Sequence, residues 1–197
     1  MIMQPGLTPG FAEPEADAQG LFRAVLDAMS HPGKRLAPRL DLAPPAPLLP
    51  LAGATALTLC DAETPIWLDP AFAPAMDWLR FHCGAPIVAE AERAAFAFLQ
   101  GATLPDALDR FPAGTALSPE DGATLVIAVD GFAGGSRYIL TGPGIEGEAA
   151  LTVAGLAPRF LDHRQMQAGR FPMGHDAILV APDGLACLPR TTQMRKG

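Results

Sequence analysis

Prolines and glycines interrupt the apolar segments of this chain at short intervals, and this spacing limits the length of every helix and strand. The 197 residues include 21 prolines and 20 glycines, a share still below that of a disordered chain. Hydrophobic residues make up 49% and charged residues 18%, so the chain can bury a core. We therefore expect one globular, loop-rich domain built from short elements.

The charge and the cysteines narrow the class of protein. A formal net charge of −7 argues against nonspecific binding to nucleic acids or anionic membranes. The first residues have neither the basic nor the apolar part of a secretory signal, and no apolar run is long enough to span a membrane. Cys60, Cys83 and Cys187 show neither zinc nor C-x-x-C spacing. We interpret them as buried thiols and expect a cytoplasmic protein.

The apolar pattern predicts a mixed α/β fold with antiparallel content. The clearest helix is expected over 17–29, where Asp17 can cap the start. Its apolar face is formed by Leu21, Phe22, Val25, Leu26 and Met29. Two further helices are expected over 74–83 and 156–166. Strands are expected at 54–61, 66–68, 95–99, 124–129, 137–141, 149–153, 177–181 and 185–189.

The domain organisation follows from the same pattern. Residues 1–16 are interrupted by prolines and glycines and are expected to form an N-terminal arm. Residues 17–192 are expected to form a single α/β domain, and 193–197 a C-terminal tail that frays. The segment Pro182-Asp183-Gly184 separates the last two expected strands and indicates a hairpin.

Gly142, Gly144 and Gly147 form a G-x-G-x-x-G run directly after an expected strand, the pattern of a dinucleotide-binding site. Pro143 removes an amide that could face a phosphate, and two glutamates place negative charge where the pyrophosphate would lie. The following segment, 149–153, is an expected strand, which leaves no room for the crossover helix. We therefore favour a sharp turn between two strands.

No familiar catalytic pattern occurs in the chain. There is no nucleophile elbow, no phosphate loop and no histidine spacing typical of a zinc site. The two lysines, Lys34 and Lys196, are not placed in rigid, desolvated surroundings as a Schiff base requires. The sequence predicts no catalytic, cofactor-binding or metal-binding residue.

Arg190-Thr191-Thr192 offers a guanidinium fork beside two hydroxyls, which suits an anion. The candidate contacts for a ligand or a partner are therefore Gly142, Gly144, Arg190 and Thr191. A solvated rim or a contact with a partner protein is the favoured interpretation of Arg190, and anion binding stays open.

An ordered set of short motifs runs from about residue 19 to residue 192. The motifs are Phe22-Arg23 with 28–30 and Pro32-Gly33, then 64–68, 79–82, 114–116, 122–125, 140–145, 171–174 and 188–192. In this order the set resembles the H subunit of the carbon–phosphorus lyase system of phosphonate degradation. His31 and the Ala/Pro-rich stretch 37–50 depart from the pattern.

The resemblance implies a three-layer α/β/α sandwich with a mixed sheet, similar to the large domain of pyridoxal-phosphate-dependent transferases but without the cofactor. It also implies a homodimer that joins the G, I and J subunits in a core complex. That complex transfers an alkylphosphonate onto the ribose of ATP with loss of adenine, giving a ribose 1-alkylphosphonate 5-triphosphate. The expected role is a required, non-catalytic subunit. The alternatives are a stand-alone enzyme that binds a phosphate-bearing ligand near 142–147, and a pure scaffold.

Overall fold

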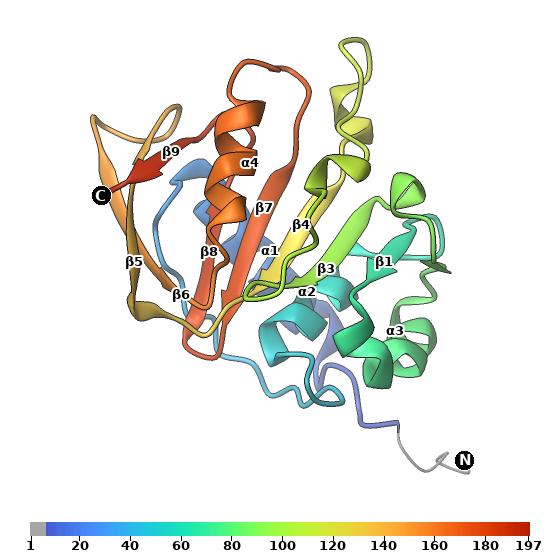
Figure 1. Cartoon of the computed structure of the whole chain (residues 1–197). Helices are drawn as coiled ribbons and strands as arrows, with labels where there is room; N and C mark the ends of the chain where they lie inside the picture. Colours follow the sequence, from blue (N-terminus) through green and yellow to red (C-terminus); the bar gives the residue numbers. More distant parts are fainter. Residues whose placement is uncertain (1–6) are drawn as a thin grey trace.

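A six-stranded mixed sheet forms the centre of the fold (Figure 1). The computed structural model describes residues 7–197, and residues 1–6 of the expected N-terminal arm lie outside them. The strand order is β2-β1-β3-β4-β7-β8, and every neighbouring pair is parallel except β7 and β8. The strands are β1 (Ile66–Leu68), β2 (Ile87–Val88), β3 (Phe96–Gln100), β4 (Thr124–Ala128), β7 (Asp176–Ala181) and β8 (Gly184–Leu188).

The two faces of this sheet bury separate cores, because successive residues of a strand point to opposite sides. Phe98, Val126 and Ile178 face a core shared with helices α1 (Pro14–Ser30), α2 (Pro50–Leu59) and α3 (Met76–Cys83). Leu99 and Leu125 face the other core, which is closed by helix α4 (Arg159–Gln167) and a second sheet. Figure 1 shows α4 in front of the sheet and α1 behind it. The fold is therefore α/β with helices on both faces of a mixed sheet.

The second sheet has three antiparallel strands in the order β6-β5-β9. They are β5 (Gly131–Thr141), β6 (Ala149–Ala154) and β9 (Gln193–Lys196). The expectation that the C-terminal end frays is wrong, because β9 pairs with β5 and places Lys196 opposite Tyr138. Buried Met194 anchors the strand in the core beside α4.

The expected strand over 54–61 is wrong, because residues 50–59 form helix α2. Pro50 occupies its first turn, where a proline costs no hydrogen bond. Residues 51–56 are all buried, so the segment lacks the polar face that distinguishes a helix from a buried strand. Even Thr55 is accommodated inside the helix, since its hydroxyl donates to the Leu51 carbonyl at 2.7 Å.

The other expected elements are found, with shifted ends. Helix α1 begins before residue 17, with Pro14 in its first turn and the Asp17 carboxylate accepting the Glu13 amide at 3.0 Å. Helix α4 begins after residue 156, and α3 begins after residue 74 because a 3₁₀ helix precedes it. The β7–β8 hairpin is confirmed. The 3₁₀ segments are η1 (Pro70–Ala75), η2 (Ala91–Arg93), η3 (Leu108–Arg110) and η4 (Pro119–Asp121).

Two further features were not expected from the sequence. Strand β5 starts at Gly131 and continues through a register shift, although the expected strand covered only 137–141. The described part of the N-terminal arm lies against α3, because Trp78 Nε1 donates to the Thr8 carbonyl at 2.8 Å and His82 Nε2 lies 3.0 Å from the same oxygen. None of the helices in residues 7–197 has the length and apolar character needed to cross a membrane.

Candidate functional site

The G-x-G-x-x-G run forms the turn between β5 and β6, which are antiparallel neighbours with Leu140 opposite Ala149. Gly142, Gly144 and Gly147 have φ values of 133°, 81° and 70°, which glycine adopts without strain. A dinucleotide fingerprint opens a helix after the glycines, whereas a strand follows here. The turn interpretation is confirmed, and the run lacks the structural context of a dinucleotide site.

This turn is held between two segments that are distant in the sequence. A Cβ atom on Gly144 would lie 2.3 Å from the Ser30 carbonyl oxygen, at the end of α1. A Cβ atom on Gly142 would lie 3.0 Å from the Thr191 carbonyl oxygen. The structure therefore brings Gly142 against Thr191 and Gly144 against Ser30, and both glycines serve close backbone packing.

Replacing Gly144 with alanine is expected to lower the free energy of unfolding by about 3 kcal/mol, from a positive φ and a clash with backbone. Gly147→Ala is the matched control, because its φ is also positive but a Cβ atom there would meet nothing within 4 Å. The control is expected to cost only about 1–2 kcal/mol. Urea denaturation of both variants tests this, and equal losses would contradict the close packing at Gly144.

Arg190 is engaged inside the protein. Its side chain is 15% exposed and pairs with Asp176, with Nη2 2.7 Å from Oδ2. The Arg190 amide also donates to Asp176 Oδ1 at 2.7 Å. Nη1 donates to the carbonyls of Pro119 and Pro172. Most of the guanidinium donors are thus used by the protein itself, and an anion would have to displace them.

A second polar group, buried beneath α4, was missed by the sequence reasoning. His163 Nε2 lies 3.1 Å from His175 Nδ1, and His175 Nε2 lies 3.1 Å from the Phe111 carbonyl. A carbonyl only accepts, so His175 Nε2 carries the proton and Nδ1 accepts from His163 and from Gln167 Nε2 at 2.6 Å. Arg164 donates to three backbone carbonyls, those of His175, Pro189 and Thr192.

Burial controls the ionisation of this buried group. Desolvation, followed by the charge of His175, lowers the pKa of His163 to about 4. Desolvation is also the largest cause that lowers the pKa of His175 and that lowers the pKa of Arg164 to about 10. Both imidazoles are therefore neutral near pH 7. The side chains of His163, Arg164, Gln167 and His175 are all buried. Their contacts therefore indicate a structural network that connects α4 to β7 and β9.

One sequence signal could have indicated this network. Helix α4 has Phe160, His163, Arg164 and Gln167 at positions i, i+3, i+4 and i+7, which share a face. That is the buried face. Three of its four positions are polar, so the core beneath α4 has to satisfy them with hydrogen bonds. The histidine partner, His175, lies 8 residues after Gln167, and no local spacing rule links it to the helix.

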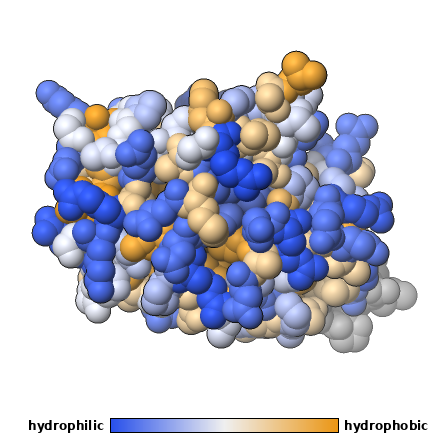
Figure 2. Space-filling view, turned by 45° about the horizontal axis from the view of Figure 1, so that its top comes forward, coloured by the Kyte–Doolittle hydropathy of each residue, from blue (hydrophilic) through white to orange (hydrophobic). Residues whose placement is uncertain are grey.

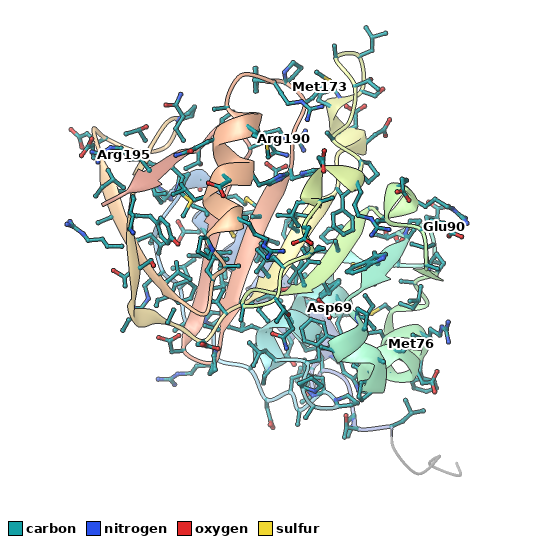
Figure 3. The ribbon with its side chains drawn as sticks, in the orientation of Figure 1. Asp69, Met76, Glu90, Met173, Arg190 and Arg195 are labelled. Carbon is teal, nitrogen blue, oxygen red and sulfur yellow. The ribbon has the colours of Figure 1, made fainter. Side chains whose placement is uncertain are left out.

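Four of the motifs that carry the family resemblance meet at one end of the molecule, where β4 and β7 begin: 114–116, 122–125, 171–174 and 188–192. A Cβ atom on Gly122 would lie 2.7 Å from the Gly174 carbonyl oxygen. The Gly174 amide donates to the Ala113 carbonyl at 2.8 Å. Met173 and Arg190 lie at this end in Figure 3. Figure 2 turns it towards the reader and shows hydrophilic side chains around small apolar areas. We call it the Arg190 end.

The groove nearest this end does not suit a polyanion. It has a volume of about 310 Å³ and lies beside the first residues of β3 and β4. Arg93 lines it, but so do Glu120 and Asp121, whose carboxylates repel phosphate groups. Carboxyl ends of strands are the usual ligand site in such sheets. Between β3 and β4 that edge is closed by backbone packed at Gly101. A Cβ atom on Gly101 would lie 2.5 Å from the Gly155 carbonyl oxygen.

The remaining candidates for chemistry are placed as follows. Lys34 is exposed and bonds to Asp27 at 2.7 Å, and Lys196 is exposed on β9. Cys60 and Cys187 are buried, as expected, whereas Cys83 is only half-buried. Burial raises the pKa of all three thiols. Within residues 7–197, no group of three His, Cys, Asp or Glu side chains is arranged to hold a metal ion.

Comparison with known proteins gives the family. Residues 9–195 match the family described as "Bacterial phosphonate metabolism protein (PhnH)". The chain is 40% identical over 191 residues to "Alpha-D-ribose 1-methylphosphonate 5-triphosphate synthase subunit PhnH" of Rhizobium meliloti, covering 94% of each chain. It is 39% identical over 176 residues to "Putative C-P lyase subunit protein HtxG" of Stutzerimonas stutzeri, covering 89% of this chain and 85% of that protein. The chain therefore belongs to the PhnH family of bacterial phosphonate metabolism proteins.

Proposed function

We propose that this chain is a required, non-catalytic subunit of the carbon–phosphorus lyase core complex. The observation that carries this proposal is its 40% identity, over 94% of both chains, to a relative named as a subunit of a ribose 1-methylphosphonate 5-triphosphate synthase. In the proposed reaction a phosphonate oxygen bonds to the ribose C1′ of ATP while the C1′–N9 bond breaks. Adenine leaves, and the product is a ribose 1-alkylphosphonate 5-triphosphate.

The proposal includes partners, location and fold ancestry. The chain forms a homodimer and joins the G, I and J subunits in the cytoplasm. Its fold is a cofactor-free relative of the large domain of pyridoxal-phosphate-dependent transferases. Helices on both faces of a mixed sheet support this fold assignment. The two lysines support the loss of the cofactor, because Lys34 and Lys196 are both exposed, whereas a Schiff-base lysine requires a desolvated site.

The geometry of the site favours a non-catalytic role. The Arg190 guanidinium is bound to Asp176 and to two carbonyls of neighbouring loops. His163 and His175 are buried and hydrogen-bonded to each other. Catalytic groups have to reach the reacting atoms, and these groups reach only other parts of the protein.

Deletion of the gene tests the proposal. We expect the deletion strain to lose growth on methylphosphonate as sole phosphorus source and to keep growth on phosphate. A plasmid carrying the wild-type gene should restore growth. Wild-type growth of the deletion strain on methylphosphonate would contradict the required role. Calorimetry of the purified chain with ATP, NAD and methylphosphonate tests the stand-alone enzyme, which predicts binding by the chain alone.

Substituting Arg190 separates structure from chemistry. We expect Arg190→Lys to lower the free energy of unfolding by about 1–2 kcal/mol, because the bidentate contact with Asp176 is lost. The transfer rate of the assembled complex should stay within about twofold of the wild type. Asp176→Asn is the matched control, since it weakens the same ion pair from the other side. A tenfold loss of transfer in a fully assembled Arg190→Lys complex would show that Arg190 contributes to the chemistry.

A further inference from the structure

A groove lies between helix α1 and the segment that leads away from the helix. It has a volume of about 450 Å³, which is within the range of small-ligand sites. Its lining combines two charged side chains with an apolar part, and the residues are Arg23, Asp27, Ala24, Leu36, Ala37 and Pro38. We call it the Arg23 groove. None of its lining residues belongs to the Arg190 end or to the glycine turn.

Arg23 carries a charge that the folded chain leaves uncompensated. Asp27 follows it at i+4, the spacing at which an arginine and a carboxylate can pair on a helix. Both oxygens of Asp27 are occupied by other groups, because Oδ2 accepts from Lys34 Nζ at 2.7 Å and Oδ1 lies 2.9 Å from His31 Nδ1. Within residues 7–197, Arg23 takes part in no ion pair and no side-chain hydrogen bond. Its exposed guanidinium therefore keeps its donors for a ligand.

The charges along the groove favour an anion over a cation. The stretch of chain that forms it carries one carboxylate, Asp27, and three cations, Arg23, Lys34 and Arg35. Lys34 is paired with Asp27, and Arg35 is paired with Asp183. The unbalanced charge is therefore that of Arg23. The pair between Lys34 and Asp27 is exposed, so the remaining N–H donors of Lys34 are open to an oxygen of a ligand.

The apolar part of the groove limits the kind of anion. Leu36 and Pro38 are half-buried and Ala37 is exposed. A hydrated inorganic anion gains nothing from this surface, whereas an alkyl group attached to the anion would cover it and leave water. Leu36 is fixed by two backbone hydrogen bonds with Leu185, at 2.9 and 2.7 Å. This side of the groove is therefore preorganised for a ligand.

We propose that the Arg23 groove binds an organic oxyanion, namely a phosphonate or phosphate monoester that carries a short alkyl group. The Arg23 guanidinium donates to the oxygens of the headgroup, Lys34 adds a further donor, and the alkyl group lies against Leu36 and Pro38. A guanidinium fork matches the geometry of such headgroups. The proposal assigns binding and no chemical step. It goes beyond the proposed subunit role and does not depend on it.

Calorimetry of the full chain at low ionic strength, where charges are screened least, tests the class of ligand. The probes are propylphosphonate, propyl phosphate, methylphosphonate and inorganic phosphate. We expect both propyl compounds to bind with dissociation constants of about 1 mM or below. Methylphosphonate and inorganic phosphate should bind several-fold more weakly, because they bury less apolar surface. The tighter of the two propyl compounds distinguishes phosphonates from phosphate esters.

Two results of this titration would contradict the proposal. Equal affinity for propylphosphonate and inorganic phosphate would show that the apolar part of the groove makes no contact. No binding of either propyl compound up to about 10 mM would overturn the site altogether.

Substitutions test the residues of the site. We expect Arg23→Gln to raise the dissociation constant of propylphosphonate at least about tenfold, because charge-assisted hydrogen bonds are lost. Ala37→Asp should also raise it, since it places a carboxylate in the groove. Arg137→Gln is the matched control, because Arg137 is exposed on β5 and its loss changes the net charge equally. The control should stay within about twofold of the wild type, and circular dichroism confirms that each variant is folded.

Amide chemical shifts measured by nuclear magnetic resonance locate the ligand on the wild-type chain. On addition of propylphosphonate we expect the largest changes at residues 23–27 and 34–38. Changes confined to 142–147 and Arg190 would place the ligand at the alternative site and overturn the Arg23 groove. Growth of the deletion strain on methylphosphonate tests the subunit role separately, so either proposal can fail without the other.

Discussion

Acidification from about pH 7 to about pH 4 is expected to lower the free energy of unfolding by up to about 3 kcal/mol through His163 alone. Burial lowers the pKa of His163 from 6.5 to about 4 in the folded protein. Between these values the unfolded chain binds a proton that the folded chain excludes, so stability falls as the pH falls. The contribution is complete above about pH 6.5 and is lost towards pH 4. Chemical denaturation at several pH values measures the slope.

His163→Gln is the control for this pH dependence, because a glutamine amide can still donate to His175 Nδ1 but does not titrate. We expect the variant to show a shallower slope between about pH 4 and pH 6.5. The exposed carboxylates of Asp27 and Asp61 have lowered pKa values, led by hydrogen bonds from Lys34 and Thr64. Protonation of these two carboxylates therefore affects the free energy of unfolding mainly at pH values near and below 3.8, the ordinary pKa of aspartate. Equal slopes for the variant and the wild type would contradict the role of His163.

Replacing Arg164 with leucine is expected to lower the free energy of unfolding by about 3–5 kcal/mol. Arg164 donates to the carbonyls of His175, Pro189 and Thr192, which belong to the segments around β7, β8 and β9. Leucine preserves apolar volume but removes all three of these hydrogen bonds, and only the Pro189 carbonyl keeps a further donor, the Thr192 amide. The loss should also loosen β9. Urea denaturation gives the first quantity, and hydrogen exchange of the β9 amides gives the second.

Arg195→Ala is the matched control for Arg164, because Arg195 lies on β9 but its ion pair with Glu148 is exposed at 57% and 56%. Figure 3 shows Arg195 at the outer edge of the molecule. An exposed pair of this kind contributes less than about 1 kcal/mol. Similar losses for the two arginine variants would show that the buried carbonyl contacts of Arg164 do not stabilise β9.

The reliable sequence predictions rest on local physical signals. The β7–β8 hairpin follows from Pro182-Asp183-Gly184 between two apolar runs, and the structure has it. The turn at Gly142–Gly147 follows from the proline and the glutamates within it. Where the local signal is ambiguous, the prediction is wrong. Residues 50–59 are apolar on all sides, so a buried helix and a buried strand look alike in that segment.

The candidate site shows the limit of sequence reasoning more clearly. Arg190 is recognisable in the sequence as a possible anion ligand, because a guanidinium beside two hydroxyls suits an anion. Only the structure shows that Asp176, Pro119 and Pro172 take up its donors. The pairing of His163 with His175 also depends on how α4 crosses β7, and side chains far apart in sequence meet only after the layers pack.

The sequence by itself determined the family, through the order of its short motifs, and the α/β class, through the period and punctuation of its apolar segments. Both follow from the order of residues along the chain and need no contact between distant segments. The tertiary structure alone decided which polar groups are buried, which hydrogen-bond donors are engaged, and which apolar side chains of α1 stay exposed. These depend on contacts between distant segments, such as Gly144 against Ser30. Burial and desolvation set the pKa values, and they exist only once the chain has packed.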